Sequence, residues 1–228
     1  MKKVIVTGAD GFIGSHLVRY LSENSIEVYA IIIKNSLTKK RIEEIKNVHV
    51  IEASDDEYSF IAKFLPAQPV AFFHLAWAGV APEERDNINL QYSNIHMTMN
   101  AIKLAYKLKV KKFIMPGSTM EYTECDGEIN EKAIPNPQNM YGAAKLAVRF
   151  FGASACRQYD IHFVYAVISS IYSADRIDNN VISYTIRKLL NKEKPSLTKL
   201  EQLWDYVYID DVVNALYLLA IKNLSKSF

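Results

Sequence analysis

The stretch VIVTGADGFIG, residues 4–14, decides the fold of this chain. Its first part, Val4 to Thr7, is a β-branched run, which predicts a buried parallel strand. After the glycines that follow, apolar residues recur at helical spacing from Ile13 to Leu21. A strand, a glycine-rich turn and a helix in this order build a site for a dinucleotide pyrophosphate, because the helix N-terminus offers free amides and the positive end of its dipole.

The three glycines are Gly8, Gly11 and Gly14, with the spacing G-x-x-G-x-x-G rather than G-x-G-x-x-G. In such a turn the first glycine permits the tight bend, the second lets the backbone approach the phosphates, and the third lets the helix pack on the strand. A glycine-rich turn that binds nothing is the alternative interpretation.

Length and composition limit the classes of protein to which this chain can belong. The 228 residues are 50% hydrophobic, which is enough for the core of one domain, and a net charge of +2 is too small to imply a nucleic-acid or membrane partner. Neither a signal-peptide core nor an apolar run of membrane-spanning length is present, so we expect a cytoplasmic protein. Cys125 and Cys156 lack metal-ligand spacing, so we expect buried free thiols and no metal site.

Strand and helix patterns alternate along the chain. Strands are expected at 3–7, 27–33, 48–52, 70–75, 112–116 and 161–168, and helices at 12–23, 38–46, 56–65, 88–109, 139–158, 178–191 and 210–222. This alternation predicts an α/β fold, a Rossmann-like doubly wound parallel sheet with its ligand at the carboxyl ends of the strands. The loop after the fourth strand, HLAWAG at 74–79, has small residues that let the backbone approach a cofactor, and His74 is expected to be a hydrogen-bonded structural residue.

Tyr141 and Lys145 lie four residues apart on an expected helix, so both side chains can point into one cleft. A nearby ammonium favours phenolate, and we therefore expect Lys145 to lower the pKa of Tyr141. The pair alone is weak evidence in a chain with 14 tyrosines. It gains weight because it follows a strand that ends in MPGST, residues 115–119.

Together these motifs resemble the short-chain dehydrogenase/reductase superfamily, and Gly11 to Gly14 resemble its extended branch, the NAD-dependent epimerase/dehydratase family of nucleotide-sugar enzymes. The resemblance implies that Ser118 hydrogen-bonds a substrate oxygen, Tyr141 moves its proton, and Lys145 holds the nicotinamide ribose and tunes Tyr141. Thr119 is the alternative hydroxyl. The cofactor-binding residues that the motifs and the resemblance imply are Gly8, Asp10, Gly11, Phe12, Ile13, Gly14, Lys34, Leu75, Ala76, Asn94, Tyr141 and Lys145. For Asn94, a solvated amide on the helix surface is the alternative.

Cofactor choice depends on the end of the second strand, where a carboxylate favours NAD and cations favour NADP. Residues 30–36 contain no acid and offer Lys34, with Lys39, Lys40 and Arg41 shortly after. NADP is therefore slightly favoured over NAD, although Lys39 to Arg41 can also form a solvated helix face.

The segment from Trp204 to Val212 resembles the late strand-to-helix segment of extended family members. Trp204 either belongs to the core, which we favour, or stacks on a base or sugar, and Asp210 or Asp211 is expected to cap the following helix. Because the chain stops at Phe228, we expect a dinucleotide-binding domain over 1–168 and a partial substrate-binding region, truncated or reduced, over 169–228.

The function expected from this resemblance is hydride transfer at a ring carbon of a nucleotide-diphosphate sugar, as a 4-epimerase or 4-ketoreductase with Tyr141 as proton shuttle. Thr119 and Met120 replace an Asp-Glu pair of relatives that dehydrate sugars, which argues against dehydration. The alternative is a cofactor-binding regulatory or remnant protein without turnover. We also expect a homodimer formed through 88–109 and 139–158, whose surplus apolar residues include Leu104, Ala105, Leu108, Leu146, Phe150 and Phe151.

Overall fold

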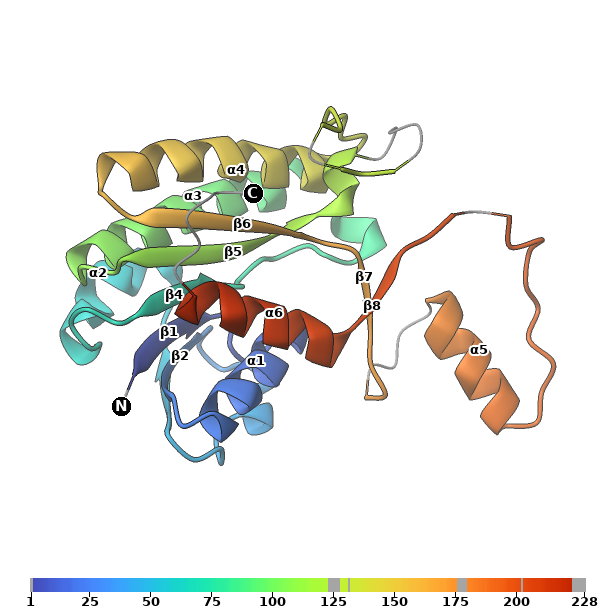
Figure 1. Ribbon diagram of the computed structural model, residues 1–228, viewed down its shortest axis with the longest axis horizontal. Helices are drawn as coiled ribbons and strands as arrows, with labels where there is room; N and C mark the ends of the chain where they lie inside the picture. Colours follow the sequence, from blue (N-terminus) through green and yellow to red (C-terminus); the bar gives the residue numbers. More distant parts are fainter. Residues whose placement is uncertain (1, 123–127, 131, 176–179, 202, 223–228) are drawn as a thin grey trace.

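The computed structural model describes residues 2–122, 128–130, 132–175, 180–201 and 203–222. Its centre is a six-stranded parallel sheet of order β3-β2-β1-β4-β5-β6 (Figure 1). The strands are β1 (Lys3–Thr7), β2 (Glu27–Ile32), β3 (Val48–Glu52), β4 (Ala71–His74), β5 (Lys112–Ser118) and β6 (His162–Ile168). All six expected strands are confirmed, with ends that shift by at most two residues.

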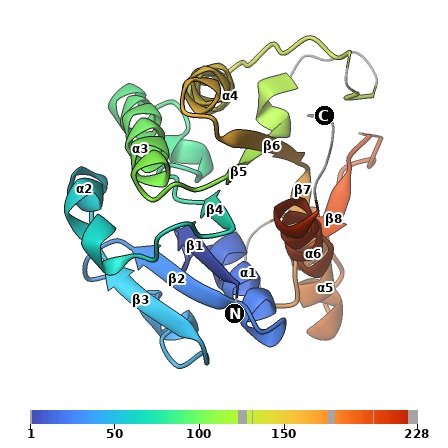
Figure 2. The same cartoon turned by 60° about the vertical axis from the view of Figure 1, so that its left-hand side comes forward.

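Helices cover both faces of the sheet (Figure 2). On one face lie α1 (Phe12–Glu23) and α6 (Ile209–Ile221), and on the other lie α2 (Tyr58–Ile61), α3 (Ile88–Lys107) and α4 (Met140–Gln158). Each face buries its own apolar cluster, one centred on Leu17, Val28 and Leu216 and the other on Phe72 and Phe113. The doubly wound α/β fold is therefore confirmed.

The strand order reverses between β1 and β4, which are neighbours in the sheet although β2 and β3 separate them in the chain. Ligands of open parallel sheets bind at such a switch point, outside the carboxyl ends of the strands. The glycine turn after β1 and the His74 loop after β4 meet there. The topology thus brings the two cofactor candidates of the sequence to one place.

Two expected helices differ from the structure. Over 38–46 only a single 3₁₀ turn forms, η1 (Lys39–Arg41), and 56–65 divides into η2 (Asp55–Glu57), α2 and η3 (Ala62–Phe64). Short helices bury few residues, so packing rather than propensity decides whether they form. Asp210 and Asp211 lie in the first turn of α6 instead of capping it, since Tyr208 holds the cap position and makes no side-chain cap bond.

Beyond β6 the chain forms a smaller unit beside the main sheet. β7 (Ser170–Tyr172) pairs in parallel with β8 (Tyr206–Tyr208), and α5 (Val181–Leu190) lies between them in the sequence and projects away from the sheet (Figure 1). β7 has no counterpart among the expected strands. Within the described residues, no helix is long and apolar enough to cross a membrane.

Candidate functional site

The glycine turn after β1 is built by contacts that exclude side chains. Gly8 has a φ of +64°, and a Cβ there would lie 2.6 Å from the backbone nitrogen of Ala76. A Cβ on Gly14 would overlap the carbonyl oxygen of Gly8 and come within 2.9 Å of the Cα of Ala9. The expected roles of the first and third glycines in the turn, the tight bend and the close packing of helix on strand, are confirmed.

The N-terminus of α1 is open at Gly11, its cap residue, because no side chain of the described residues caps it. A Cβ on Gly11 would have one neighbour within 4 Å, the carbonyl oxygen of Gly8 at 3.2 Å. Bare backbone amides at a helix N-terminus are a general anion site. The cradle therefore fits a dinucleotide pyrophosphate, with Phe12 and Ile13 in the first turn of the helix.

The loop after β4 is tied to the sheet by buried polar groups. His74 bonds Thr7 Oγ1 through Nδ1 at 2.8 Å and Thr98 Oγ1 through Nε2 at 3.2 Å. It is fully buried, which lowers its pKa to about 3, so it is neutral and structural as expected. The backbone nitrogen of Leu75 donates to Thr7 O at 3.1 Å, and Ala76 packs against Gly8.

Asn94 anchors the same loop. Its Oδ1 accepts from the backbone nitrogen of Ala78, and its Nδ2 donates to the Ala78 carbonyl, both at 2.9 Å. The side chain is fully buried, so the alternative of a solvated amide is wrong. Direct contact between Asn94 and a cofactor stays a prediction.

The segment after β2 folds over the glycine turn. The carboxylate of Asp10 accepts bonds from the hydroxyls of Ser36 and Thr38, and the Arg41 guanidinium donates to the Asp10 carbonyl at 3.3 Å. Lys34 instead pairs with Glu57, whose pKa falls to about 2, chiefly because of that bond. Of the expected cations, Arg41 is thus tied to the turn, whereas Lys34 already has a carboxylate partner.

Ser118, Tyr141 and Lys145 come together at the carboxyl ends of β5 and β6. Ser118 ends β5 and Tyr141 is the second residue of α4; both line the same cleft, and the Ser118 hydroxyl acts to lower the pKa of the Tyr141 phenol. Lys145 is one turn further along α4 and only 4% exposed, and its ammonium donates to the Pro116 carbonyl at 3.1 Å. Thr119 begins η5 (Thr119–Tyr122) and lines the same cleft.

The expectation that Lys145 lowers the pKa of Tyr141 is wrong. Burial raises the pKa of Tyr141, and the Ser118 hydroxyl and the charge of Arg85 act against this. The Lys145 ammonium donates to Pro116 O and lies 3.7 Å from the ring centre of Trp77 and 5.8 Å from that of Tyr141. Burial also lowers the pKa of Lys145, to about 7.

Two residues of the site were missed by sequence reasoning. Trp77 places its indole face on the Lys145 ammonium and donates through Nε1 to Gln91 Oε1 at 3.1 Å. Glu121 is a fully buried carboxyl directly behind Ser118, and it accepts from the Ser118 backbone nitrogen at 2.7 Å. A tryptophan within a small-residue loop and an acid within an apolar turn were the available signals.

The cleft that joins these groups has a volume of about 1600 Å³ and extends from Ile13 and Leu75 to β7, α5 and Trp204. Trp204 is 59% exposed and bonds Ser170 Oγ at 2.7 Å, so the core interpretation of this residue is wrong. Within the described residues no cluster of three His, Cys, Asp or Glu side chains could hold a metal ion. Cys156 is buried and free as expected, whereas Cys125 lies outside the described residues.

Comparison with protein families matches residues 4–227 to the NAD dependent epimerase/dehydratase family. Among curated relatives, CDP-abequose synthase of Salmonella typhimurium is 28% identical over 96% of this chain and 70% of its own length. A dTDP-D-glucose 4,6-dehydratase of Dictyostelium discoideum is 24% identical over 98% of this chain and 56% of its own length. The chain thus spans between 56% and 70% of the length of these two relatives.

Solved structures agree on the architecture. UDP-glucose 4-epimerase of Thermotoga maritima, determined with UDP-glucose, superposes with a TM-score of 0.82 at 26% identity and covers 99% of this chain and 75% of that one. UDP-N-acetylglucosamine 4-epimerase of Methanobrevibacter ruminantium has a TM-score of 0.83 at 23% identity over 98% and 74% of the two chains.

Proposed function

The chain belongs to the NAD dependent epimerase/dehydratase family, and from this premise we propose that it acts on a nucleotide-diphosphate sugar as a 4-epimerase or 4-ketoreductase. The observation that carries the proposal is that Ser118 and Tyr141 line one cleft, together with Lys145 one helical turn further along α4. A hydroxyl that holds an oxygen and a phenol that moves its proton are the groups that interconversion of an alcohol and a ketone requires.

NAD or NADP, when bound, supplies the hydride acceptor and donor. We expect the glycine turn and the first turn of α1 to hold its pyrophosphate, Leu75 and Ala76 to contact it along the backbone, and Lys145 to hold its ribose. Burial keeps Tyr141 a neutral phenol, ready to give its proton to a keto oxygen at the sugar ring. In the reverse direction the phenolate of Tyr141, which is what remains after that proton transfer, accepts the proton of the ring hydroxyl while Ser118 donates a hydrogen bond to the same oxygen.

Dehydration is disfavoured by the residues beside Ser118. A 4,6-dehydratase is among the relatives, but elimination needs a further acid or base at the substrate. Thr119 and Met120 carry no carboxyl, and the carboxyl of Glu121 is fully buried behind Ser118. We therefore place this chain with enzymes that transfer hydride without elimination.

We propose that the cofactor is NADP or NAD, with NADP slightly favoured. Because Lys34 pairs with Glu57, a 2′-phosphate would have to compete with that carboxylate for Lys34. Arg41, tied to the Asp10 carbonyl, is the better placed cation. Titration of NADP(H) and NAD(H) into Lys34→Glu and Arg41→Glu separates the two residues, and tighter NAD(H) binding by the wild type would overturn the NADP preference.

A homodimer remains a proposal, but the residues that support it differ from those expected from the sequence. Leu104, Ala105 and Leu108 are buried within the monomer, whereas Phe150 and Phe151 are 66% and 59% exposed on α4. Exposed aromatic side chains of this kind favour association. Light scattering at micromolar concentration tests the dimer, and Phe150→Glu should produce monomer. The cytoplasmic location also stays a prediction.

The test of the function is product analysis with a panel of nucleotide-diphosphate sugars. A 4-epimerase interconverts two sugars without net consumption of cofactor, whereas a 4-ketoreductase consumes one NAD(P)H for each keto sugar reduced. If neither reaction occurs with any sugar nucleotide while cofactor binds, the alternative of a cofactor-binding protein without turnover replaces the proposal. The family match and the joined Ser118, Tyr141 and Lys145 favour the enzyme.

A further inference from the structure

A buried carboxyl lies behind the proposed catalytic groups. Glu121 is 0% exposed, and its Oε1 accepts from the Ser118 backbone nitrogen at 2.7 Å. Its Oε2 is also buried and has no hydrogen-bond partner within the part of the chain that the structure describes. A charged carboxylate oxygen in such a place is strongly unfavourable, because it has lost water and gained nothing in return.

Counting the protons at Tyr165 points to the state of this carboxyl. The Tyr165 hydroxyl on β6 lies 2.8 Å from Glu121 Oε1 and 2.8 Å from the carbonyl oxygen of Lys145. A phenol has one proton, and a carbonyl oxygen can only accept. If Glu121 were a carboxylate, the single proton would face two acceptors and one contact would join two lone pairs.

A proton on Glu121 Oε1 satisfies both contacts. Its hydroxyl then donates to the Tyr165 oxygen, Tyr165 donates to the Lys145 carbonyl, and Oε1 keeps a lone pair for the Ser118 amide. The orphaned Oε2 becomes an uncharged carbonyl oxygen, which is far less costly to bury.

The charges around Glu121 do not compensate it as an ion pair. Arg149 on α4 donates to the Tyr122 hydroxyl at 2.6 Å, and Lys145 donates to Pro116 O. Burial raises the pKa of Glu121 and outweighs the bonds from Ser118 and Tyr165 and the charges of Arg149 and Lys145. Tyr141, the other titratable group nearby, feels a charge on Glu121 as a rise in its own pKa.

We propose that Glu121 is held as a neutral carboxylic acid and is a positioning residue, which fixes the backbone of Ser118 without placing a negative charge beside Tyr141 and Lys145. A carboxylate here would raise the pKa of both groups, so the neutral form leaves both pKa values lower. The effect on turnover rests on the proposed function, but the protonation of Glu121 does not.

The protonation is tested by infrared difference spectroscopy of the cofactor-free protein at neutral pH, wild type minus Glu121→Gln. The expected result is a C=O band of a protonated carboxyl that shifts in D₂O and is lost in the variant, whereas the exposed Glu44→Gln control leaves it unchanged. Tyr165→Phe removes the partner of the carboxyl proton and should move the band. Absence of the band, or a band that Tyr165→Phe leaves in place, overturns the proposal.

The positioning role is tested by the pH profile of turnover. Glu121→Gln keeps an uncharged side chain of the same size, but at the Oε1 position it places either an oxygen that accepts from the Ser118 amide or an NH₂ group that donates to Tyr165, and so keeps one of the two contacts. Its kcat/KM should therefore fall less than that of Glu121→Ala, and the basic limb of its pH profile should stay in place. Glu121→Ala leaves the Ser118 amide unpaired and should lose about tenfold or more. A shift of the basic limb to lower pH in Glu121→Gln would show that the native residue is charged. If the infrared band is present and no sugar nucleotide reacts, the proposed function fails and the neutral Glu121 stands.

Discussion

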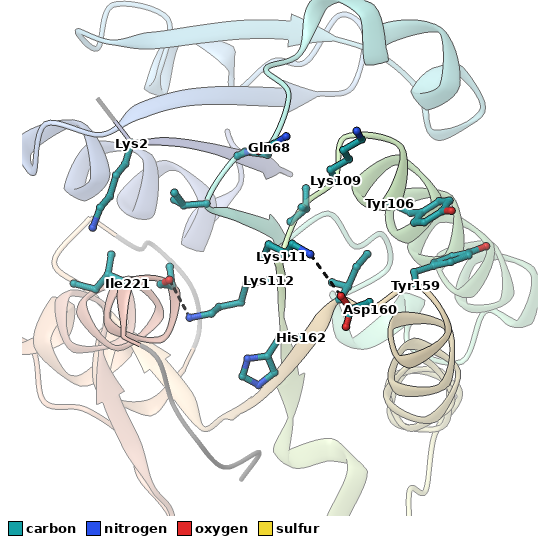
Figure 3. Close-up of a pocket in the computed structure, with 15 residues that line it drawn as sticks. Lys2, Gln68, Tyr106, Lys109, Lys111, Lys112, Tyr159, Asp160, His162 and Ile221 are labelled. Carbon is teal, nitrogen blue, oxygen red and sulfur yellow. Dashed lines mark hydrogen bonds and ion pairs between the residues drawn. The ribbon is translucent and has the colours of Figure 1, made fainter.

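Both ends of the central sheet combine a buried lysine with tyrosines, but the two lysines have different roles. The cleft at the carboxyl ends of the strands buries Lys145 beside Tyr141, and a cavity of about 840 Å³ at the amino ends is lined by Lys2, Lys109, Lys111, Lys112 and two tyrosines (Figure 3). At the amino end Lys112 donates to the carbonyls of Leu219, Ala220 and Lys222, and Lys111 pairs with Asp160 at 3.5 Å.

Helix direction explains the difference. The helices α3, α4 and α6 end at the amino side of the sheet, where their last carbonyls carry a partial negative charge. At the end of α6, Lys112 donates to these carbonyls. α1 begins at the carboxyl side without a side-chain cap, and among the described residues Lys145 donates to one carbonyl there, that of Pro116. A buried lysine is therefore structural where helices end and is available for chemistry where they begin.

Tyr141→Phe should give the largest effect. Loss of the phenol removes the proton transfer, so kcat should fall by about 100-fold to 10,000-fold. Cofactor affinity should stay nearly unchanged, since the hydroxyl contributes chiefly in the transition state. Turnover assays with fluorescence titration of NAD(P)H measure both quantities. Equal turnover by the variant and the wild type on any accepted sugar nucleotide would falsify the role of Tyr141.

The two buried lysines should respond oppositely to methionine. Lys112→Met leaves three carbonyls at the end of α6 without their donor and should cost about 2 kcal/mol of unfolding free energy. Lys145→Met removes a buried charge with one partner, so it should be neutral or stabilising while turnover and ribose binding are lost. Urea unfolding of both variants compares them directly. If Lys145→Met is destabilised more than Lys112→Met, the proposed difference between the lysines at the two ends of the sheet is wrong.

Lys145 should contribute to the pH dependence of the free energy of unfolding. Its pKa is about 7 in the folded protein and 10.5 in the reference state. Between these values the unfolded chain binds a proton that the folded chain does not, so the free energy of unfolding rises with pH, by up to about 1.4 kcal/mol per unit. Below pH 7 both states bind the proton and the term is constant. Subtracting the Lys145→Met curve isolates the effect, and a flat difference between pH 7 and 10 contradicts the lowered pKa.

Lys111→Gln should have the smallest effect. Its pair with Asp160 joins side chains that are 77% and 98% exposed, and such pairs contribute little. Neither the urea midpoint nor kcat/KM should change measurably. A loss of turnover in this variant would mean that the amino-end cavity takes part in function, and would break the distinction between the two ends.

Local patterns were sufficient for most of the fold. The β-branched run before Gly8, the glycine spacing and the helical period from Ile13 are local, and the structure has β1 and α1 at the expected bounds. The strand expected at 112–116, observed as Lys112–Ser118, and the helix that brings Tyr141 and Lys145 onto one side also follow from local periodicity. The short segments at 38–46 and 56–65 deviated, because a helix of a few residues depends on what it packs against.

The sequence by itself determined the order of the elements, the glycine turn and the spacing of Tyr141 and Lys145, since periodicity and backbone freedom act between near neighbours. Only the tertiary structure decided the pKa values of the site residues and the partners of their charged groups. The raised pKa of Tyr141, the pairing of Lys34 with Glu57, the indole on Lys145 and the burial of Glu121 arise between segments that are distant in the chain. Desolvation and Coulomb energy depend on distance in space, which packing alone sets.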